Sequence, residues 1–161
     1  MESATPRFQP KNPDCRATAT ETFNRQRAMK TLGISISRLE PGEVDLQMDY
    51  SADLTQQHGF IHAGVITAGL DNACGMAAFT LMPAGTGVLT VEFKTNLLAP
   101  ARGERFAFRA TVVKPGRTLT VCEARAYAMH DGVETLIATM SGTLMALAGR
   151  ATAPGTVGVP A

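Results

Sequence analysis

One carboxylate stands alone in a long apolar stretch of this sequence. Residues 54–91 contain no Lys, Arg or Glu, and Asp71 is their only formal charge. Burial disfavours the charged form of a carboxylate, and carboxylates kept in such surroundings often take part in catalysis. Asp71 is therefore a candidate nucleophile or general base.

The turn before this stretch supplies a second chemical group. His62, Ala63 and Gly64 begin a predicted helix, and the first N–H groups of a helix have no partner inside it. Small residues let a carbonyl oxygen approach these groups, and the helix dipole favours negative charge there. The sequence predicts an oxyanion site at Ala63, with Gly64 as a second donor. Asp71 lies about 10 Å farther along the axis, so an antiparallel helix of a second subunit is needed to bring an acid to this site.

Neither face of the predicted helix has the composition of a solvent-exposed surface. One face is apolar and consists of Ile66, Leu70, Ala73 and Ala77. The opposite face consists of small residues and the acid: Gly64, Ala68, Asp71, Gly75 and Ala78. A solvated face normally carries Lys and Glu. One sheet can cover only the first face, so we expect a homo-oligomer, a dimer or a homotetramer built as a dimer of dimers, with the acid at the subunit interface.

The rest of the chain predicts an α+β domain over residues 16–147, with flexible tails over 1–15 and 148–161. A helix over 20–33 ends at Gly33, and two strands over 34–39 and 43–49 follow. After the central helix, period-two patterns predict strands over 88–98, 104–114, 117–129 and 133–147, joined by short Pro/Gly turns as an antiparallel meander. In the first of these strands, strict alternation places Thr90 on the opposite face from Phe93.

Composition limits the partners and the compartment. With 161 residues, a net charge of +1 and 18% charged residues, the chain is expected to bind neither nucleic acid nor an anionic membrane surface. A central Asp and interrupting Gly and Pro residues argue against a membrane span. Three cysteines, Cys15, Cys74 and Cys122, suit neither a disulfide framework nor a CxxC metal site, and no signal peptide is evident, so we expect a cytoplasmic location.

Two segments resemble a known family. "HGFIHAGVITAGLDNACG" and "VLTVEFKTNLLAPARGERFAFRATVVKPGRTLTVCEARAY" are similar to the hotdog-fold acyl-CoA thioesterases of the PaaI-like, phenylacetate-pathway branch. The resemblance covers about residues 20–147. It implies a curved antiparallel sheet of about six strands wrapped around one long central helix, and hydrolysis of an acyl- or aryl-CoA to the free acid and coenzyme A.

The resemblance also implies roles for individual residues. Asp71 would act on the thioester carbonyl as nucleophile or general base, and the N–H of Ala63 would polarise that carbonyl in a site shared by two subunits. His62 would steady the turn, the Gln56 amide would position water or the carbonyl, and the Thr90 hydroxyl would orient water. The combination of Gln56 with Asp71 mixes two patterns of the family, in which Asn usually accompanies Asp and Gln usually accompanies Glu.

Coenzyme A is the leaving group of this reaction, so we expect no separate cofactor and no metal. Its phosphates need cations near the site. Basic residues near strand ends and the "KPGR" turn are the candidates: Lys94, Arg102, Lys114 and Arg117.

Two other functions stay open on the sequence alone. Asp53 and His58 have the Asp-x4-His spacing of hotdog enoyl-CoA hydratases, although the usual Asn-Pro between the pair is absent. A non-catalytic acyl-CoA binding protein is the second alternative, because a helix N-terminus can bind a carbonyl without turning it over.

Overall fold

The computed structural model describes residues 7–149. The helices of this range are α1 (Cys15–Asn24), α2 (Arg27–Thr31) and α3 (Ala63–Phe79), with a 3-10 turn over Ala52–Leu54. The strands are β1 (Ile34–Glu40), β2 (Glu43–Asp49), β3 (Gly87–Leu97), β4 (Arg105–Lys114), β5 (Leu119–His130) and β6 (Val133–Leu147).

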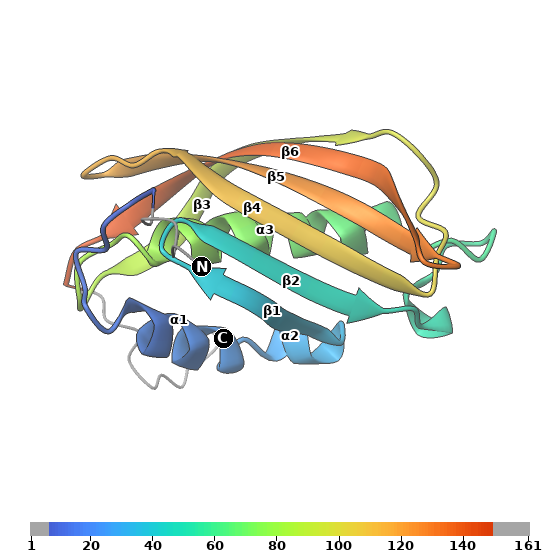
Figure 1. Cartoon of the computed structure of the whole chain (residues 1–161), viewed down its shortest axis with the longest axis horizontal. Helices are drawn as coiled ribbons and strands as arrows, with labels where there is room; N and C mark the ends of the chain where they lie inside the picture. The colour runs from blue at the N-terminus through green and yellow to red at the C-terminus, as the bar shows by residue number, and fades with distance from the viewer. Residues whose placement is uncertain (1–6, 150–161) are drawn as a thin grey trace, which may run out of the picture.

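The strands form one antiparallel sheet in the order β1-β2-β4-β5-β6-β3. Figure 1 shows this sheet curving over α3, while α1 and α2 lie beside β1. The expected α+β fold, with six strands wrapped around one long helix, is confirmed.

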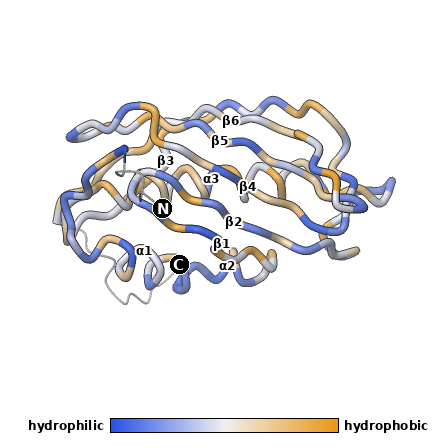
Figure 2. The backbone as a smooth tube through the Cα atoms, viewed as in Figure 1, coloured by the Kyte–Doolittle hydropathy of each residue, from blue (hydrophilic) through white to orange (hydrophobic). Residues whose placement is uncertain are grey.

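Alternation along the strands gives the sheet its buried face. In β2 the residues Val44, Leu46 and Met48 are buried, and the residues between them are more exposed because successive side chains of a strand point to opposite faces. Figure 2 shows this change of hydropathy along β2. The buried side chains of the sheet meet the apolar face of α3 in one continuous core.

Small residues let α3 lie close to the sheet. A Cβ atom added at Gly69 would come within 2.6 Å of the Phe108 ring, which is fully buried. One strand farther, the Cys122 thiol donates to the carbonyl oxygen of Cys74 at 3.6 Å. These contacts set the depth at which α3 sits.

The two predicted faces of α3 differ in burial. Ile66, Leu70, Ala73 and Ala77 are buried, as expected. On the other face Gly64 is exposed, and Ala68, Asp71 and Gly75 are half-buried, whereas Ala78 is fully buried near the C-terminal end. The open part of this face therefore extends from the helix N-terminus to Gly75.

The predicted four-strand meander is wrong in one respect: β3 does not pair with β4. Its partner is β6, and the second neighbour of β4 is β2. β3 is consequently an edge strand. The period-two pattern identifies each strand but does not specify which strands are neighbours. The sequence is therefore equally compatible with pairing of β4 to β3 and with the observed pairing of β4 to β2.

Strict alternation along β3 is also wrong. Thr90 pairs with Leu144 and Glu92 pairs with Thr143, so Val91 is an extra residue in a β-bulge. A bulge shifts the alternation by one residue. Thr90 therefore shares the core-facing side of the sheet with Phe93, which lies opposite Gly142.

The N-terminal part is more ordered than expected. The predicted helix over 20–33 is divided at Gln26, whose backbone is extended and whose amide contacts Asn72 and Met76 of α3. Of the expected tail, Phe8 packs against the core, and Cys15 is buried at the start of α1. The remaining tail residues, 1–6 and 150–161, lie outside the described range.

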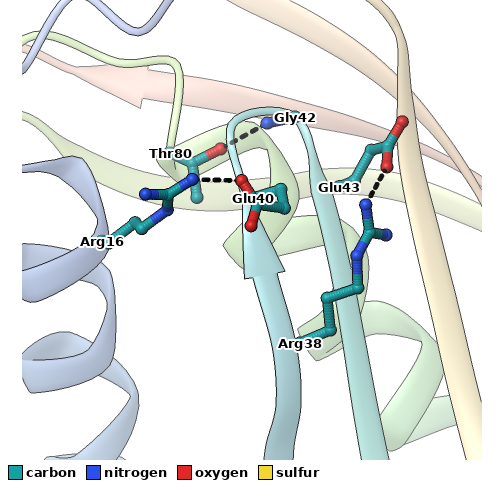
Figure 3. Close-up of polar contacts among 6 residues, drawn as sticks. All are labelled: Arg16, Arg38, Glu40, Gly42, Glu43 and Thr80. Atoms are coloured by element: carbon teal, nitrogen blue, oxygen red, sulfur yellow. Dashed lines mark hydrogen bonds and ion pairs between the residues drawn. The ribbon is translucent and has the colours of Figure 1, made fainter. Parts of the chain in front are cut away.

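Polar contacts fix the C-terminal end of α3 to the β1–β2 turn (Figure 3). The Thr80 hydroxyl accepts from the Gly42 N–H at 2.8 Å and donates to the Ala77 carbonyl at 2.7 Å. Arg16 of α1 pairs with Glu40 at the end of β1. On the neighbouring side of the turn, Arg38 pairs with Glu43 across β1 and β2 at 2.8 Å.

None of the described helices is long and apolar enough to cross a membrane.

The contact at Gly69 predicts a stability difference between two helical glycines. Gly69→Ala should lower the free energy of unfolding by about 1 to 3 kcal/mol, because the new methyl group overpacks against Phe108. Gly75→Ala is the matched control: a Cβ at Gly75 meets no atom within 4 Å, so alanine should stabilise by up to about 1 kcal/mol through helix propensity. Urea denaturation at one protein concentration measures both. Equal stability of the two variants would contradict the packing described here.

Candidate functional site

The N-terminus of α3 is capped by a histidine. His62 has an extended backbone (φ −60°, ψ 138°), and its Nδ1 accepts from the N–H of Gly64 at 2.9 Å. An Nδ1 that accepts carries no proton, so the proton of the neutral ring is on Nε2. His62 therefore holds the turn, and the N–H of Gly64 is already donated to this cap.

The N–H of Ala63 is in a different position. Among residues 7–149 it has no hydrogen-bond acceptor, as expected for the first residue of a helix. Ala63 lines a pocket of about 480 Å³. The free N–H, the helix dipole and the small side chain together give this pocket a donor suited to an oxyanion.

Gln56 lies in the same pocket. Its loop is closed by the hydrogen bond from the Gln56 N–H to the Phe60 carbonyl at 2.8 Å and by a positive φ of 81° at Gly59. The side-chain oxygen of Gln56 accepts from the N–H of His58. This contact orients the amide so that its NH₂ group is the part left for a ligand.

The remaining wall of the pocket is apolar. It comes from the loop before α3, from α3 itself, from the end of β3 and the segment after it, and from β6. The lining residues besides Gln56 and Ala63 are Phe60, Ile61, Ile66, Leu97, Leu98, Ala99, Pro100, Ala101 and Ile137. Among the described residues no charged side chain lines the pocket, so it suits an uncharged apolar group.

Asp71 and Thr90 form the second half of the site. The Thr90 hydroxyl donates to Asp71 Oδ1 at 2.8 Å, because the bulge at Val91 turns Thr90 toward α3. Below them, hydrogen bonding with Cys122, burial and the charge of Asp71 raise the pKa of the Cys74 thiol. This thiol therefore stays protonated at neutral pH and is a poor nucleophile.

The two halves are separated within one chain. Ala63 and Asp71 are eight residues apart on α3, or about 12 Å along its axis. Asp71 is not among the residues that line the pocket. The structure thus brings Gln56 together with Ala63, and Asp71 together with Thr90, but it does not bring all four together.

The four basic candidates do not form one cluster either. Arg102 lies before β4 and lines a pocket of about 340 Å³ with Tyr50 and Gly59. Lys114 is the last residue of this ten-residue strand and Arg117 follows it, so both lie about 30 Å from the first residue of the strand. Lys94 is exposed on the edge strand β3.

Two further groups of polar residues lie outside this site. Asp53 and His58 form no ion pair or hydrogen bond with each other in the described range, so the hydratase spacing has no geometric support. Glu104, His130 and Asp131 lie within 4.8 Å of one another through their ligand atoms. The two acids contact different ring nitrogens, at 3.2 Å and 3.6 Å, which is the arrangement of ion pairs around a histidine.

Sequence patterns missed the segment that closes the pocket. Residues 97–101, Leu-Leu-Ala-Pro-Ala, are predicted from the sequence as a strand end and a turn, but they line the pocket. Leu97 and Leu98 are 58% and 55% exposed, and such exposure cannot be inferred from an apolar strand sequence. The only sequence signal for this pocket segment is Pro100, which ends the apolar run.

Comparisons with known proteins agree on one family. The model of the thioesterase superfamily matches residues 58–135. A crystal structure of a thioesterase family protein from Silicibacter pomeroyi is 60% identical, with a TM-score of 0.83, and the match covers 84% of this chain and 99% of that one. The E. coli PaaI protein, from the phenylacetic acid degradation operon, is 18% identical with a TM-score of 0.75 over 87% of this chain and 98% of PaaI, which is a likeness of fold.

Curated relatives include a candidate esterase of Saccharolobus solfataricus. It is 32% identical over 94 residues, which are 58% of this chain and 66% of that protein. The chain spans just under two thirds of the length of the curated relatives it matches.

The cap at His62 predicts a stability effect. His62→Ala should lower the free energy of unfolding by about 1 kcal/mol, because the Gly64 N–H loses its acceptor. His62→Asn should retain most of the stability, since Asn is a favoured capping residue. Urea denaturation of both variants checks this; an alanine variant as stable as the wild type would show that the cap contributes nothing.

Proposed function

Since this chain belongs to the thioesterase superfamily, we propose that it is an acyl-CoA thioesterase, which hydrolyses the thioester to the free acid and coenzyme A. The observation that carries the proposal is the free N–H of Ala63, which opens at the start of α3 into an apolar pocket beside the amide of Gln56. A donor at this place stabilises the negative charge that develops on a thioester carbonyl oxygen.

The pocket beyond the Ala63 N–H takes the acyl group. In the part of the chain that the structure describes, its wall offers apolar side chains and one side-chain amide, that of Gln56. A charged acyl group would lose its hydration there without gaining a partner. The substrate class we propose is therefore an uncharged acyl or aryl thioester.

The acid of the reaction comes from a second subunit. Asp71 of the same chain is about 12 Å from the Ala63 N–H, too far to reach the carbonyl carbon. A two-fold axis that makes two α3 helices antiparallel places the Asp71 of each subunit near the Ala63 of the other. Each dimer then has two sites, and each site takes residues from both chains.

The edge strand β3 supports such a dimer. Its apolar side chains are exposed on one chain: Leu89 is 53%, Val91 53% and Phe93 44% exposed. An exposed apolar edge strand is a template for pairing with another strand. Antiparallel pairing of two β3 strands about a two-fold axis would cover these side chains.

The reaction steps follow from these positions. The Ala63 N–H and the NH₂ group of Gln56 hold the thioester carbonyl, and Thr90 orients the Asp71 carboxylate. In one route the carboxylate takes a proton from water while the water oxygen adds to the carbonyl carbon. In the other route the carboxylate adds first, and water hydrolyses the resulting anhydride. Both routes break the C–S bond and release coenzyme A as the thiol after protonation.

The role of Asp71 can be tested by thiol release. Wild type should hydrolyse uncharged acyl-CoAs in a panel of short, medium, long, phenylacetyl and hydroxybenzoyl thioesters. Asp71→Asn should lower kcat by about 10² to 10⁴, the usual contribution of a general base, and Asp53→Asn, which changes an exposed acid outside the site, should leave it unchanged. Full activity in Asp71→Asn would overturn the assigned role. Binding of acyl-CoA without thiol release by wild type would instead indicate a binding protein.

A further inference from the structure

A second hollow lies at the opposite end of α3 from the acyl pocket. Its volume is about 250 Å³. The N-terminal segment, the C-terminal end of α3 and the β4–β5 turn form its wall, through Phe8, Lys11, Ala78, Pro83, Pro115 and Arg117 among others. We refer to it as the Lys11–Arg117 pocket.

The charge of this pocket is positive. Within residues 7–149, Lys11 and Arg117 are its only charged lining residues, and neither forms an ion pair in that range. A third cation is next to it, because the Arg7 guanidinium lies 5.1 Å from the centre of the Phe8 ring. Unpaired cations around a hollow attract an anion, and Arg matches the geometry of phosphate.

The wall between the cations is apolar. Phe8, Pro83 and Pro115 line it, and Phe8 is itself fixed against Gly42, where an added Cβ would meet the Phe8 ring at 2.5 Å. A flat apolar ring can pack on such side chains. The pocket thus combines the features that suit the two parts of a nucleotide: an apolar wall for the base and cations for the phosphates.

The pocket and the catalytic acid share one side of α3. Asp71 and Ala78 are seven residues apart, so they lie on the same side of α3, about 10 Å apart along its axis. Gly75 lies between them, half-buried, and a Cβ added there meets nothing within 4 Å. The open backbone at Gly75 leaves room for a narrow flexible chain between the acid and the pocket.

We propose that the Lys11–Arg117 pocket binds the phosphorylated nucleotide end of coenzyme A, and that the pantetheine arm runs over Gly75 to the thioester at Asp71. This inference rests on the proposed function. It selects Arg117 from the four basic candidates and adds Lys11. One subunit then supplies the acid and the nucleotide pocket, while the other supplies the Ala63 N–H and the acyl pocket.

An acyl-pantetheine substrate distinguishes a loss of nucleotide binding from a loss of catalysis. Lys11→Ala and Arg117→Ala should each raise KM for an acyl-CoA up to about fivefold, the effect of losing one solvent-exposed charge contact, with kcat unchanged. KM for the corresponding acyl-pantetheine, which lacks the nucleotide, should not change. Arg125→Ala is the control, because Arg125 is exposed on β5 outside the pocket. An unchanged KM for acyl-CoA, or an equal rise for both substrates, would overturn the proposal.

Inhibition by adenosine 3′,5′-bisphosphate distinguishes a subsite for coenzyme A from a site for a separate nucleotide. Competitive inhibition of wild type against acyl-CoA, weakened in the double variant Lys11→Ala/Arg117→Ala, supports a substrate subsite. Non-competitive inhibition would assign the pocket to a separate nucleotide and overturn the proposal.

The inference and the proposed function can fail separately. If wild type hydrolyses no thioester, the proposed function is wrong, and calorimetric titration with adenosine 3′,5′-bisphosphate still tests the pocket. Binding by wild type that weakens in the double variant supports the nucleotide site. No binding by wild type, or equal binding by both, overturns it.

Discussion

The close packing of α3 on the sheet is the constraint on which the rest of the molecule depends. Gly69 allows the Phe108 ring to lie against the helix backbone, and the apolar face of α3 is buried as a result. Burial of one face leaves Gly64, Asp71 and Gly75 on the open side. This open side of α3 is the surface on which we propose that a second chain packs.

The same helix carries two candidate catalytic groups, and it holds them at separate positions along its axis. The free N–H of Ala63 belongs to the helix N-terminus, where the backbone has unpaired donors. Asp71 must lie farther along, where the bulge in β3 presents the Thr90 hydroxyl. An oxyanion donor and an acid on one straight helix cannot converge on a single carbon, but two antiparallel helices can. The division explains why a subunit interface is a suitable place for the site.

Sequence patterns predicted the parts of this fold that depend on local physics. Period-two alternation indicated the strands, and the glycine at position 33 ended a helix. The candidate roles of Gln56 and Thr90 came from the family resemblance alone, and the roles of all the site residues stay predictions. Features set by distant contacts were missed. The pairing of β3 with β6, the bulge at Val91 and the packing of Phe8 depend on neighbours far away in the chain, and no local pattern contains them.

Mixing two inactive variants tests the central claim, a site assembled from two chains, most directly. Ala63→Pro removes only the N–H, because proline suits the first position of a helix and His62 before it is extended. Asp71→Asn removes the acid. Each variant alone should be inactive. After subunit exchange at equal amounts, half of the dimers are mixed and half of their sites are intact, so we predict about a quarter of wild-type activity. Activity no higher than that of the single variants, with mixed dimers verified by mass spectrometry, would show that each site lies within one chain.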